Sequence, residues 1–380
     1  MNDRTKCVRT LDENEEIACI DLPLYRGVIY KHKDFEHKPG QYAYARCGTP
    51  TTVALGNLVA GLEGGCKGYT TSSGMGAISV VMKLFEPKDH IVVSADLYGG
   101  TYRYFHDYLE KYGYEFTYVD TWDAESFKKA FRDNTKCVFI ETPSNPSMHV
   151  TDLSLAHELA EEHGALLVVD NTFLSPYFQK PITFGADIVV HSATKYLGGH
   201  NDILGGVIVV ANEELAQRVF MIYMAEGNNM ASDDAWLMIR SIKTLAVRMD
   251  RQEENALEIY KYLKTFKNIK DVLYVGDPER EDYALSKKQT TGFGGMISVR
   301  VRDKDKILKY LTRFKVINFA ESLGGVESLA TYPWIATQAP IPEEQRIRTG
   351  ATDDMIRFSI GIEDVEDLKK DLYQAIEECD

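Results

Sequence analysis

The stretch that decides the fold runs Asp187-Ile188-Val189-Val190-His191-Ser192-Ala193-Thr194-Lys195-Tyr196-Leu197-Gly198-Gly199-His200. Its β-branched first part predicts a short buried strand, and its glycine-rich second part predicts a loop. Lys195 therefore stands just beyond the carboxyl end of a strand. Burial at such a place disfavours the ammonium form, lowers the pKa of the lysine and leaves a free amine that can attack a carbonyl.

Similar β-branched runs lie on both sides of this stretch and alternate with amphipathic helical segments. Continuous apolar strands separated by helices predict an α/β fold with a mostly parallel sheet that is covered on both faces. The expected strands are 91–93, 116–119, 137–140, 166–169, 188–190 and 207–210, and the expected helices include 101–112, 124–131 and 153–163. A long helical region at 231–266 leads to a smaller α/β unit, with strands at 294–299 and 355–360.

The length of 380 residues predicts two or three units rather than one simple core. Residues 1–55 show little periodicity, and we expect them to form an arm that contacts a neighbouring subunit or, alternatively, packs on its own domain. Residues 56–245 are then the large ligand-binding domain, and residues 246–380 form a small C-terminal domain.

Charge and composition narrow the class of partner. The chain has 43 Lys and Arg against 57 Asp and Glu, a formal net charge of −14, which argues against nucleic acid or an anionic membrane as the main partner. The six cysteines are scattered and favour reduced thiols, and the histidines and cysteines show no metal-site spacing. No apolar run approaches 18 residues, so no membrane span is expected, and a cytoplasmic location is the default expectation.

Chemically reactive side chains follow several of the expected strands. In parallel sheets, ligands bind at the carboxyl ends of the strands, so these side chains are expected to meet. Besides Lys195, Asp170 follows strand 166–169 and Tyr98 follows strand 91–93. Pyridoxal phosphate needs an amine for its aldehyde, an anion near its ring nitrogen and an aromatic face, and these three residues can supply them.

A phosphate group needs a cradle of donors as well. Ser73-Gly74-Met75-Gly76 opens an expected helix, whose free backbone N–H groups and positive dipole end favour an anion. Ser192 and Thr194 can add hydroxyl donors. Each of these features alone has an ordinary structural explanation, such as a solvated lysine, a capping aspartate or a turn that feeds a helix. Their conjunction at one sheet edge carries the hypothesis.

Two other classes of function stay open at this point. Gly74-x-Gly76 with Asp96 further on half-resembles a dinucleotide fingerprint and would indicate a nicotinamide-dependent dehydrogenase. The third glycine is missing, since Ser79 stands there, and Lys195 would have no task. The second class is a non-catalytic binding module that uses the same fold.

The residues from 187 to 201 closely resemble the signature of the cystathionine γ-synthase/γ-lyase family. This family comprises the Cys/Met-metabolism pyridoxal-phosphate enzymes of fold type I, the aspartate aminotransferase fold. The resemblance extends from about residue 40 to the C-terminus. Further matching segments are Tyr44-Ala45-Arg46, Ser73-Gly74-Met75, 96–103, Asp170-Asn171-Thr172-Phe173, 320–325 and 356–364.

The resemblance implies that Lys195 holds pyridoxal 5′-phosphate through its aldehyde, with Tyr98 and Asp170 as further catalytic residues. The implied cofactor contacts are Tyr44, Arg46, Ser73, Gly74, Met75, Tyr98, Asp170, Ser192, Thr194 and Lys195. The implied substrate contacts are Arg357, which would clamp the α-carboxylate, together with Asn145, Ser322, Glu321 and Arg103. Tyr44 and Arg46 would reach the phosphate in a neighbouring subunit, which implies a homo-oligomer, a dimer of dimers in this family.

The same resemblance implies a small sulfur-containing amino acid as substrate and a role in transsulfuration. The expected activity is that of a C–S lyase like cystathionine γ-lyase, which eliminates at the γ- or β-carbon to give a keto acid, ammonia and a thiol. The alternative is γ-replacement, as in cystathionine γ-synthase or an O-acylhomoserine sulfhydrylase. Glu321 favours enzymes of the γ-lyase and γ-synthase types, whereas Gly100 argues against a methionine γ-lyase. Thr49, Gln338 and the segment 226–232 depart from the usual family pattern.

Overall fold

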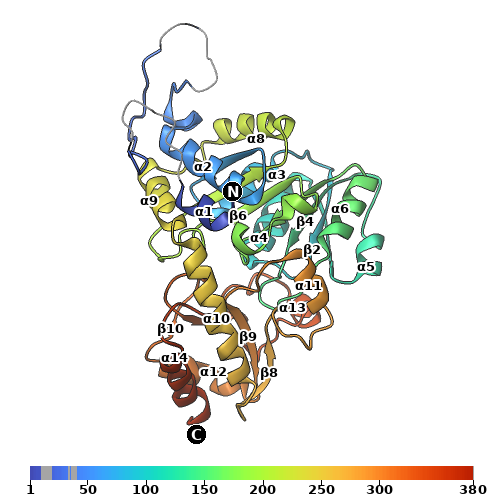
Figure 1. The fold of residues 1–380 in the computed structure, drawn as a ribbon. Helices are drawn as coiled ribbons and strands as arrows, with labels where there is room; N and C mark the ends of the chain where they lie inside the picture. Colours follow the sequence, from blue (N-terminus) through green and yellow to red (C-terminus); the bar gives the residue numbers. More distant parts are fainter. Residues whose placement is uncertain (10–18, 33–34, 36–40, 380) are drawn as a thin grey trace.

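The computed structural model describes residues 1–9, 19–32, 35 and 41–379. The acidic run at 12–16 and part of the predicted arm lie outside these residues. Two sheets organise the described chain, a larger one in the upper half of Figure 1 and a smaller one in the lower half. In the described residues, no helix is both long and apolar enough to cross a membrane. All six cysteines lie in this part of the chain and are free thiols.

The larger sheet has seven strands in the order β1-β7-β6-β5-β4-β2-β3. All six strands that the sequence predicts are present, and every neighbouring pair is parallel except those made by β7. The strands are β1 (Lys67–Thr71), β2 (His90–Ser94), β3 (Glu115–Val119), β4 (Thr135–Glu141), β5 (Leu166–Asp170), β6 (Ile188–Ser192) and β7 (Gly206–Val210).

Two features of this sheet differ from the sequence-based expectation. Strand β7 is antiparallel because the chain returns from β6 through the Lys195 loop without a crossover helix, which a parallel neighbour would need. Strand β1 was not predicted, since its sequence is polar and it lies at the edge of the sheet. Gly68 in β1 packs against the backbone of Gly56, and a Cβ there would lie 2.1 Å from the Gly56 carbonyl oxygen.

Helices cover both faces of the larger sheet, as its alternating apolar residues require. Val168 packs in the core on the side of α3, α4 and α8, whereas Val169 packs on the side of α2, α5, α6, α7 and α9. The bounds of these helices are α2 (Pro50–Glu63), α3 (Gly74–Met82), α4 (Gly99–Arg103), α5 (Ala124–Lys129), α6 (Leu153–Glu162), α7 (Ser175–Phe178), α8 (Glu213–Glu226) and α9 (Ser232–Ile242).

The helical region expected at 231–266 is two helices, α9 and α10 (Leu245–Leu263), which meet at Lys243 and Thr244. Helix α10 runs from the larger sheet down to the smaller one (Figure 1). The five strands of the smaller sheet are β8 (Ile269–Leu273), β9 (Met296–Val301), β10 (Asn318–Phe319), β11 (Leu329–Thr331) and β12 (Met355–Ser359), in the order β10-β11-β12-β9-β8. The remaining helices are α11 (Tyr283–Gln289), α12 (Ile307–Arg313), α13 (Glu343–Thr349) and α14 (Val365–Leu372).

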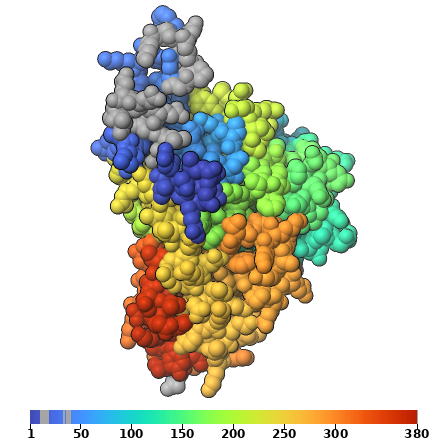
Figure 2. All heavy atoms as spheres, viewed as in Figure 1, coloured from blue at the N-terminus to red at the C-terminus, as the bar shows by residue number. Residues whose placement is uncertain are grey.

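The N-terminal helix α1 (Asp3–Val8) lies on the body of the molecule, as the dark blue atoms in Figure 2 show. Arg4 forms an ion pair of 2.8 Å with Asp250 of α10. Further along, Thr49 caps α2 through reciprocal hydrogen bonds with Thr52. Thr49, although it departs from the family pattern, thus still provides an N-cap. The boundary expected at residue 55 between the arm and the large domain falls inside α2.

Candidate active site

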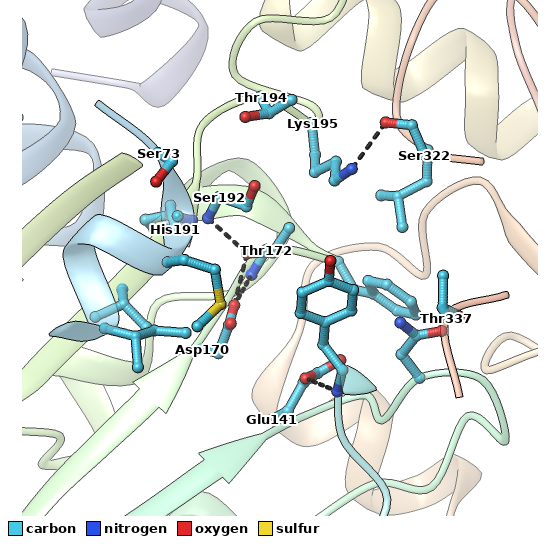
Figure 3. Close-up of a pocket in the computed structure, with 18 of the residues that line it drawn as sticks. Ser73, Glu141, Asp170, Thr172, His191, Ser192, Thr194, Lys195, Ser322 and Thr337 are labelled. Atoms are coloured by element: carbon cyan, nitrogen blue, oxygen red, sulfur yellow. Dashed lines mark hydrogen bonds between the residues drawn. The ribbon is translucent and has the colours of Figure 1, made fainter. Parts of the chain in front are cut away.

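A cavity of about 200 Å³ opens at the carboxyl ends of β4, β5 and β6, where strand-end ligand sites are expected. Figure 3 shows its side chains converging from both halves of the chain. Twelve of the residues implied by the resemblance line it: Ser73, Gly74, Met75, Tyr98, Asn145, Asp170, Ser192, Thr194, Lys195, Glu321, Ser322 and Arg357. The three others, Tyr44, Arg46 and Arg103, do not line it.

Lys195 extends into this cavity from the loop after β6. Its Nζ donates a hydrogen bond of 2.8 Å to Oγ of Ser322, which comes from the C-terminal half (Figure 3). Burial, the largest cause, and the positive charge of Arg357 lower the pKa of Lys195, Glu321 opposes both, and the resulting pKa is about 8. About a tenth of the lysine is therefore free amine at pH 7, against less than about one part in a thousand at the ordinary pKa, and the free amine is the form that can attack an aldehyde.

The pH at which this amine becomes reactive can be measured without any substrate. We expect the rate at which the apoprotein takes up pyridoxal phosphate to rise with pH and to reach half its maximum at about 8. The direction follows because raising the pH removes the proton that blocks the amine. A half-maximum near 10.5, the ordinary value for lysine, would contradict the lowered pKa. Stopped-flow absorbance of the cofactor gives this rate.

Asp170, the last residue of β5, lies on the wall of the cavity. Its Oδ1 accepts hydrogen bonds from the backbone N–H of Thr172 (3.0 Å) and from its hydroxyl (2.5 Å). Burial raises the pKa of Asp170, while the Thr172 bonds and the charge of His191 act in the opposite direction. Among the described residues, Oδ2 has no hydrogen-bond partner. A protonated ring nitrogen beside this oxygen would stabilise the carboxylate.

The start of α3 forms another wall of the cavity. Ser73 caps the helix by accepting a hydrogen bond from the Gly76 N–H at 3.0 Å. A Cβ on Gly74 would lie only 2.8 Å from Cβ of Ser192, so glycine is required for this close approach. The arrangement leaves backbone N–H groups and serine hydroxyls around one point, a geometry that suits phosphate. The Thr194 hydroxyl instead bonds the backbone of Gly205.

Arg357 is a buried cation next to this cavity. It comes from β12, is 2% exposed, and donates hydrogen bonds of 2.9 Å to Oδ1 of Asn145 and to the Ser322 carbonyl oxygen. Its Nε has no partner, and within the described chain no ion pair with a carboxylate forms. Burial lowers the pKa of Arg357 to about 10. Because an unpaired buried charge is costly, the site calls for an anionic ligand such as a carboxylate.

Sequence reasoning assigned no role to Glu141 or Thr172, which the structure places in the site. Glu141 lies beside Asp170 in the sheet register, and its Oε2 accepts the Tyr98 N–H at 2.8 Å. Burial and the charge of Asp170 raise the pKa of Glu141 well above its usual range. Thr172 joins Asp170 to the N–H of Ser192 through its hydroxyl. The signal for Glu141 was present, since it too ends an apolar strand.

The residues outside the cavity are on or near the protein surface. The Arg46 guanidinium lies 5.7 Å from the Tyr44 ring and donates to the Met224 carbonyl oxygen at 2.6 Å. Asn229, in the unusual segment 226–232, donates to the Arg46 carbonyl oxygen at 2.6 Å, so this segment supports the arm. Arg103 is exposed at the end of α4. The side chains of Tyr44, Arg46 and Arg103 therefore do not reach the cavity of their own chain.

Comparisons with known proteins agree with the geometry. Residues 4–377 match the family described as Cys/Met metabolism PLP-dependent enzyme. Cystathionine gamma-lyase of Bacillus subtilis (strain 168) is 45% identical over 364 residues, which cover 96% of each chain. Cystathionine gamma-synthase/O-acetylhomoserine (thiol)-lyase of the same organism is 42% identical, with 98% of this chain and 95% of that protein covered. The structure of cystathionine gamma-lyase from Lactobacillus plantarum complexed with L-serine matches with a TM-score of 0.96 and 37% identity over 100% of both chains.

These similarities confirm the family resemblance, the fold type I architecture and the cofactor expected from the sequence. They hold along the whole length of the chain, both in sequence and in three-dimensional arrangement. The dehydrogenase and the non-catalytic module are therefore set aside. The chain belongs to the Cys/Met metabolism family of pyridoxal-phosphate-dependent enzymes.

Proposed function

We propose that this enzyme is a C–S lyase of the cystathionine γ-lyase type, with γ- or β-elimination giving a keto acid, ammonia and a thiol. The observation that carries cystathionine as the ligand is the position of Glu321, and the higher identity to a cystathionine gamma-lyase favours elimination. Glu321 lines the cavity that holds Lys195 and also the wider opening next to it. An acid at this point suits the distal ammonium group of cystathionine, while Arg357 suits the α-carboxylate.

We propose roles for the residues of the cavity accordingly. Bound pyridoxal phosphate supplies an electron sink for the charge that develops at Cα. Lys195 would remove the Cα proton, and Asp170 would keep the ring nitrogen protonated. For γ-elimination a second proton must leave Cβ, and Lys195 with the Tyr98 hydroxyl can transfer it. Tyr98 would stack on the ring, and Ser73, Gly74, Met75, Ser192 and Thr194 would hold the phosphate.

Substrate orientation falls to residues from both halves. Arg357 binds the α-carboxylate, Asn145 holds the guanidinium in place, and Ser322 keeps Lys195 aligned through the 2.8 Å hydrogen bond. Arg103, which is exposed, is proposed to meet the far end of a longer substrate.

The proposed active unit is a homo-oligomer, a dimer of dimers. In support, Tyr44 and Arg46 lie away from the cavity of their own chain. They would complete the phosphate site of a neighbouring subunit. The proposed division remains an arm at 1–55, whose last residues form the start of α2, a large domain at 56–245 and a small domain at 246–380.

A second candidate is γ-replacement on an activated homoserine. It is favoured by the 42% identity to a cystathionine gamma-synthase/O-acetylhomoserine (thiol)-lyase, which is close to the 45% identity to a cystathionine gamma-lyase. The same Glu321 suits both candidates, because cystathionine is a substrate of one reaction and a product of the other.

Product analysis separates the two candidates. The holoenzyme is expected to release keto acid and ammonia from cystathionine, cysteine or homocysteine. Glu321→Gln should raise the KM for cystathionine about tenfold, the value of one charge-assisted hydrogen bond, and leave the KM for homocysteine unchanged. Glu327→Gln, which removes another acid at the wider opening, is the matched control. Cystathionine formed from O-acetylhomoserine and cysteine, without keto acid from the other substrates, would establish γ-replacement instead.

A further inference from the structure

The side chain of Gln338 is completely buried between two strand-end turns of the large domain. Its Nε2 donates to the Asn145 carbonyl oxygen at 2.7 Å and to the Leu97 carbonyl oxygen at 3.3 Å. The two acceptors use both hydrogens of the amide, which fixes the orientation of the group. Its Oε1 has no partner within the described chain. Gln338 itself belongs to the C-terminal half, so it joins the two parts of the molecule.

Each of the two carbonyl groups belongs to a segment that places a side chain of the active site. Leu97 precedes Tyr98, whose ring lines the cavity and whose N–H is held by Glu141. Asn145 accepts a hydrogen bond from Arg357 through Oδ1 at 2.9 Å. The Gln338 amide nitrogen therefore binds the residue next to Tyr98. It also binds the backbone of Asn145, whose side chain binds Arg357.

The turn that carries Gln338 also packs directly on the Tyr98 turn. A Cβ on Gly99 would lie 2.0 Å from the Thr337 carbonyl oxygen, so the backbones are in close contact. Gln345 adds a hydrogen bond of 2.9 Å to the Ala95 carbonyl oxygen in the same segment. Because these contacts do not need Gln338, its removal leaves the turn docked but frees the carbonyl groups of Leu97 and Asn145.

We propose that Gln338 is a positioning residue that couples Tyr98 to Arg357, so that cofactor binding and carboxylate binding favour each other. The proposal rests on the roles proposed above for these two residues. It does not depend on which sulfur amino acid is the substrate, since it concerns only the ring face and the α-carboxylate.

Gln338→Met tests the proposal, because methionine keeps the length of the side chain and removes both donors. Titration of the apoprotein with pyridoxal phosphate should show a Kd about tenfold higher, the value of one net hydrogen bond. The visible circular dichroism of the bound cofactor should change as well. An α-methyl amino acid, which has no Cα proton to lose, should bind to the holoenzyme about tenfold more weakly.

A double-mutant cycle separates positioning from a general structural effect. In a Tyr98→Ala background, Gln338→Met should leave the cofactor Kd unchanged, because the ring that it positions is absent. Gln289→Met is the matched control. Gln289 is also buried and binds the backbone of Thr151 and Leu153, but it lies outside the cavity lining. This variant should retain wild-type cofactor and amino-acid binding.

Equal cofactor Kd and circular dichroism in Gln338→Met and wild type would overturn the proposal. So would an effect of the same size with and without the Tyr98 ring. If Gln338→Met does not fold, Gln338→Asn replaces it, since its shorter amide cannot reach both carbonyl groups, and the same criteria apply. Cofactor titration needs no turnover, so a wrong substrate assignment would leave this test intact.

Discussion

Lys195→Ala is expected to reduce kcat at least about 10³-fold, within the range of acid–base catalysis, and to leave no measurable keto acid above background. In the proposed mechanism the lysine is the amine that attaches the cofactor and also the base that removes the Cα proton. Alanine can do neither. Keto acid release under saturating substrate measures the loss, and the thermal midpoint of the variant verifies that the fold is retained. Lys83→Ala, at the far end of α3, is the control and should keep full activity.

Hydride trapping locates the attachment directly. Reduction of the wild-type holoenzyme with borohydride should bleach its visible absorbance and place the cofactor label on the peptide that contains Lys195. Label on another lysine, or turnover by Lys195→Ala above a few per cent of wild type, would refute the assignment. Because trapping does not require a substrate, it distinguishes a wrong lysine from a wrong reaction.

Asp170→Asn is expected to lower kcat about 10²- to 10³-fold, the effect of removing one preorganised electrostatic group. Asparagine has the same shape and can retain a bond to Thr172, but it carries no negative charge to keep the ring nitrogen protonated. The weaker electron sink slows the removal of the Cα proton, so kcat falls while the KM changes little. Steady-state kinetics and the absorbance of the bound cofactor measure both effects.

A matched control for this charge removal is Asp187→Asn. Asp187 is also partly buried and accepts the Leu167 N–H at 2.8 Å. It precedes β6, however, and so lies at the end of this strand that faces away from the cavity. This variant should lose stability without losing kcat. A similar loss of kcat in both variants would mean that the Asp170 effect comes from the fold and not from the ring nitrogen.

The sequence predicted the main sheet well because its central strands are buried on both faces and carry almost continuous apolar residues. β1 escaped prediction, since a polar edge strand has no such run. The direction of β7 escaped it too, because periodicity does not tell whether a chain returns with or without a crossover. The break between α9 and α10 could not be predicted either, because the hydrophobic periodicity is helical on both sides of it.

Prediction of the site depended on where the strands end. Parallel strands bring Asp170 and the Lys195 loop to one edge, so their meeting followed from the fold alone. Gln338 shows the opposite case. It lies in an irregular turn, and its two acceptors are about 190 and 240 positions away along the chain. Tyr44 and Arg46 remain a prediction, since their proposed target is in another subunit.

Helix α10 limits how the two halves can move. Its 19 residues form one continuous rod about 28 Å long that belongs to the cores of both sheets. The two halves are therefore not joined by a flexible linker, such as a glycine-rich segment, about which the small half could open. Because Leu245 and Met249 anchor the first turns of α10 in the core of the larger sheet, opening must bend α10 itself, and a stiffer α10 would slow product escape while leaving the chemistry at Lys195 untouched.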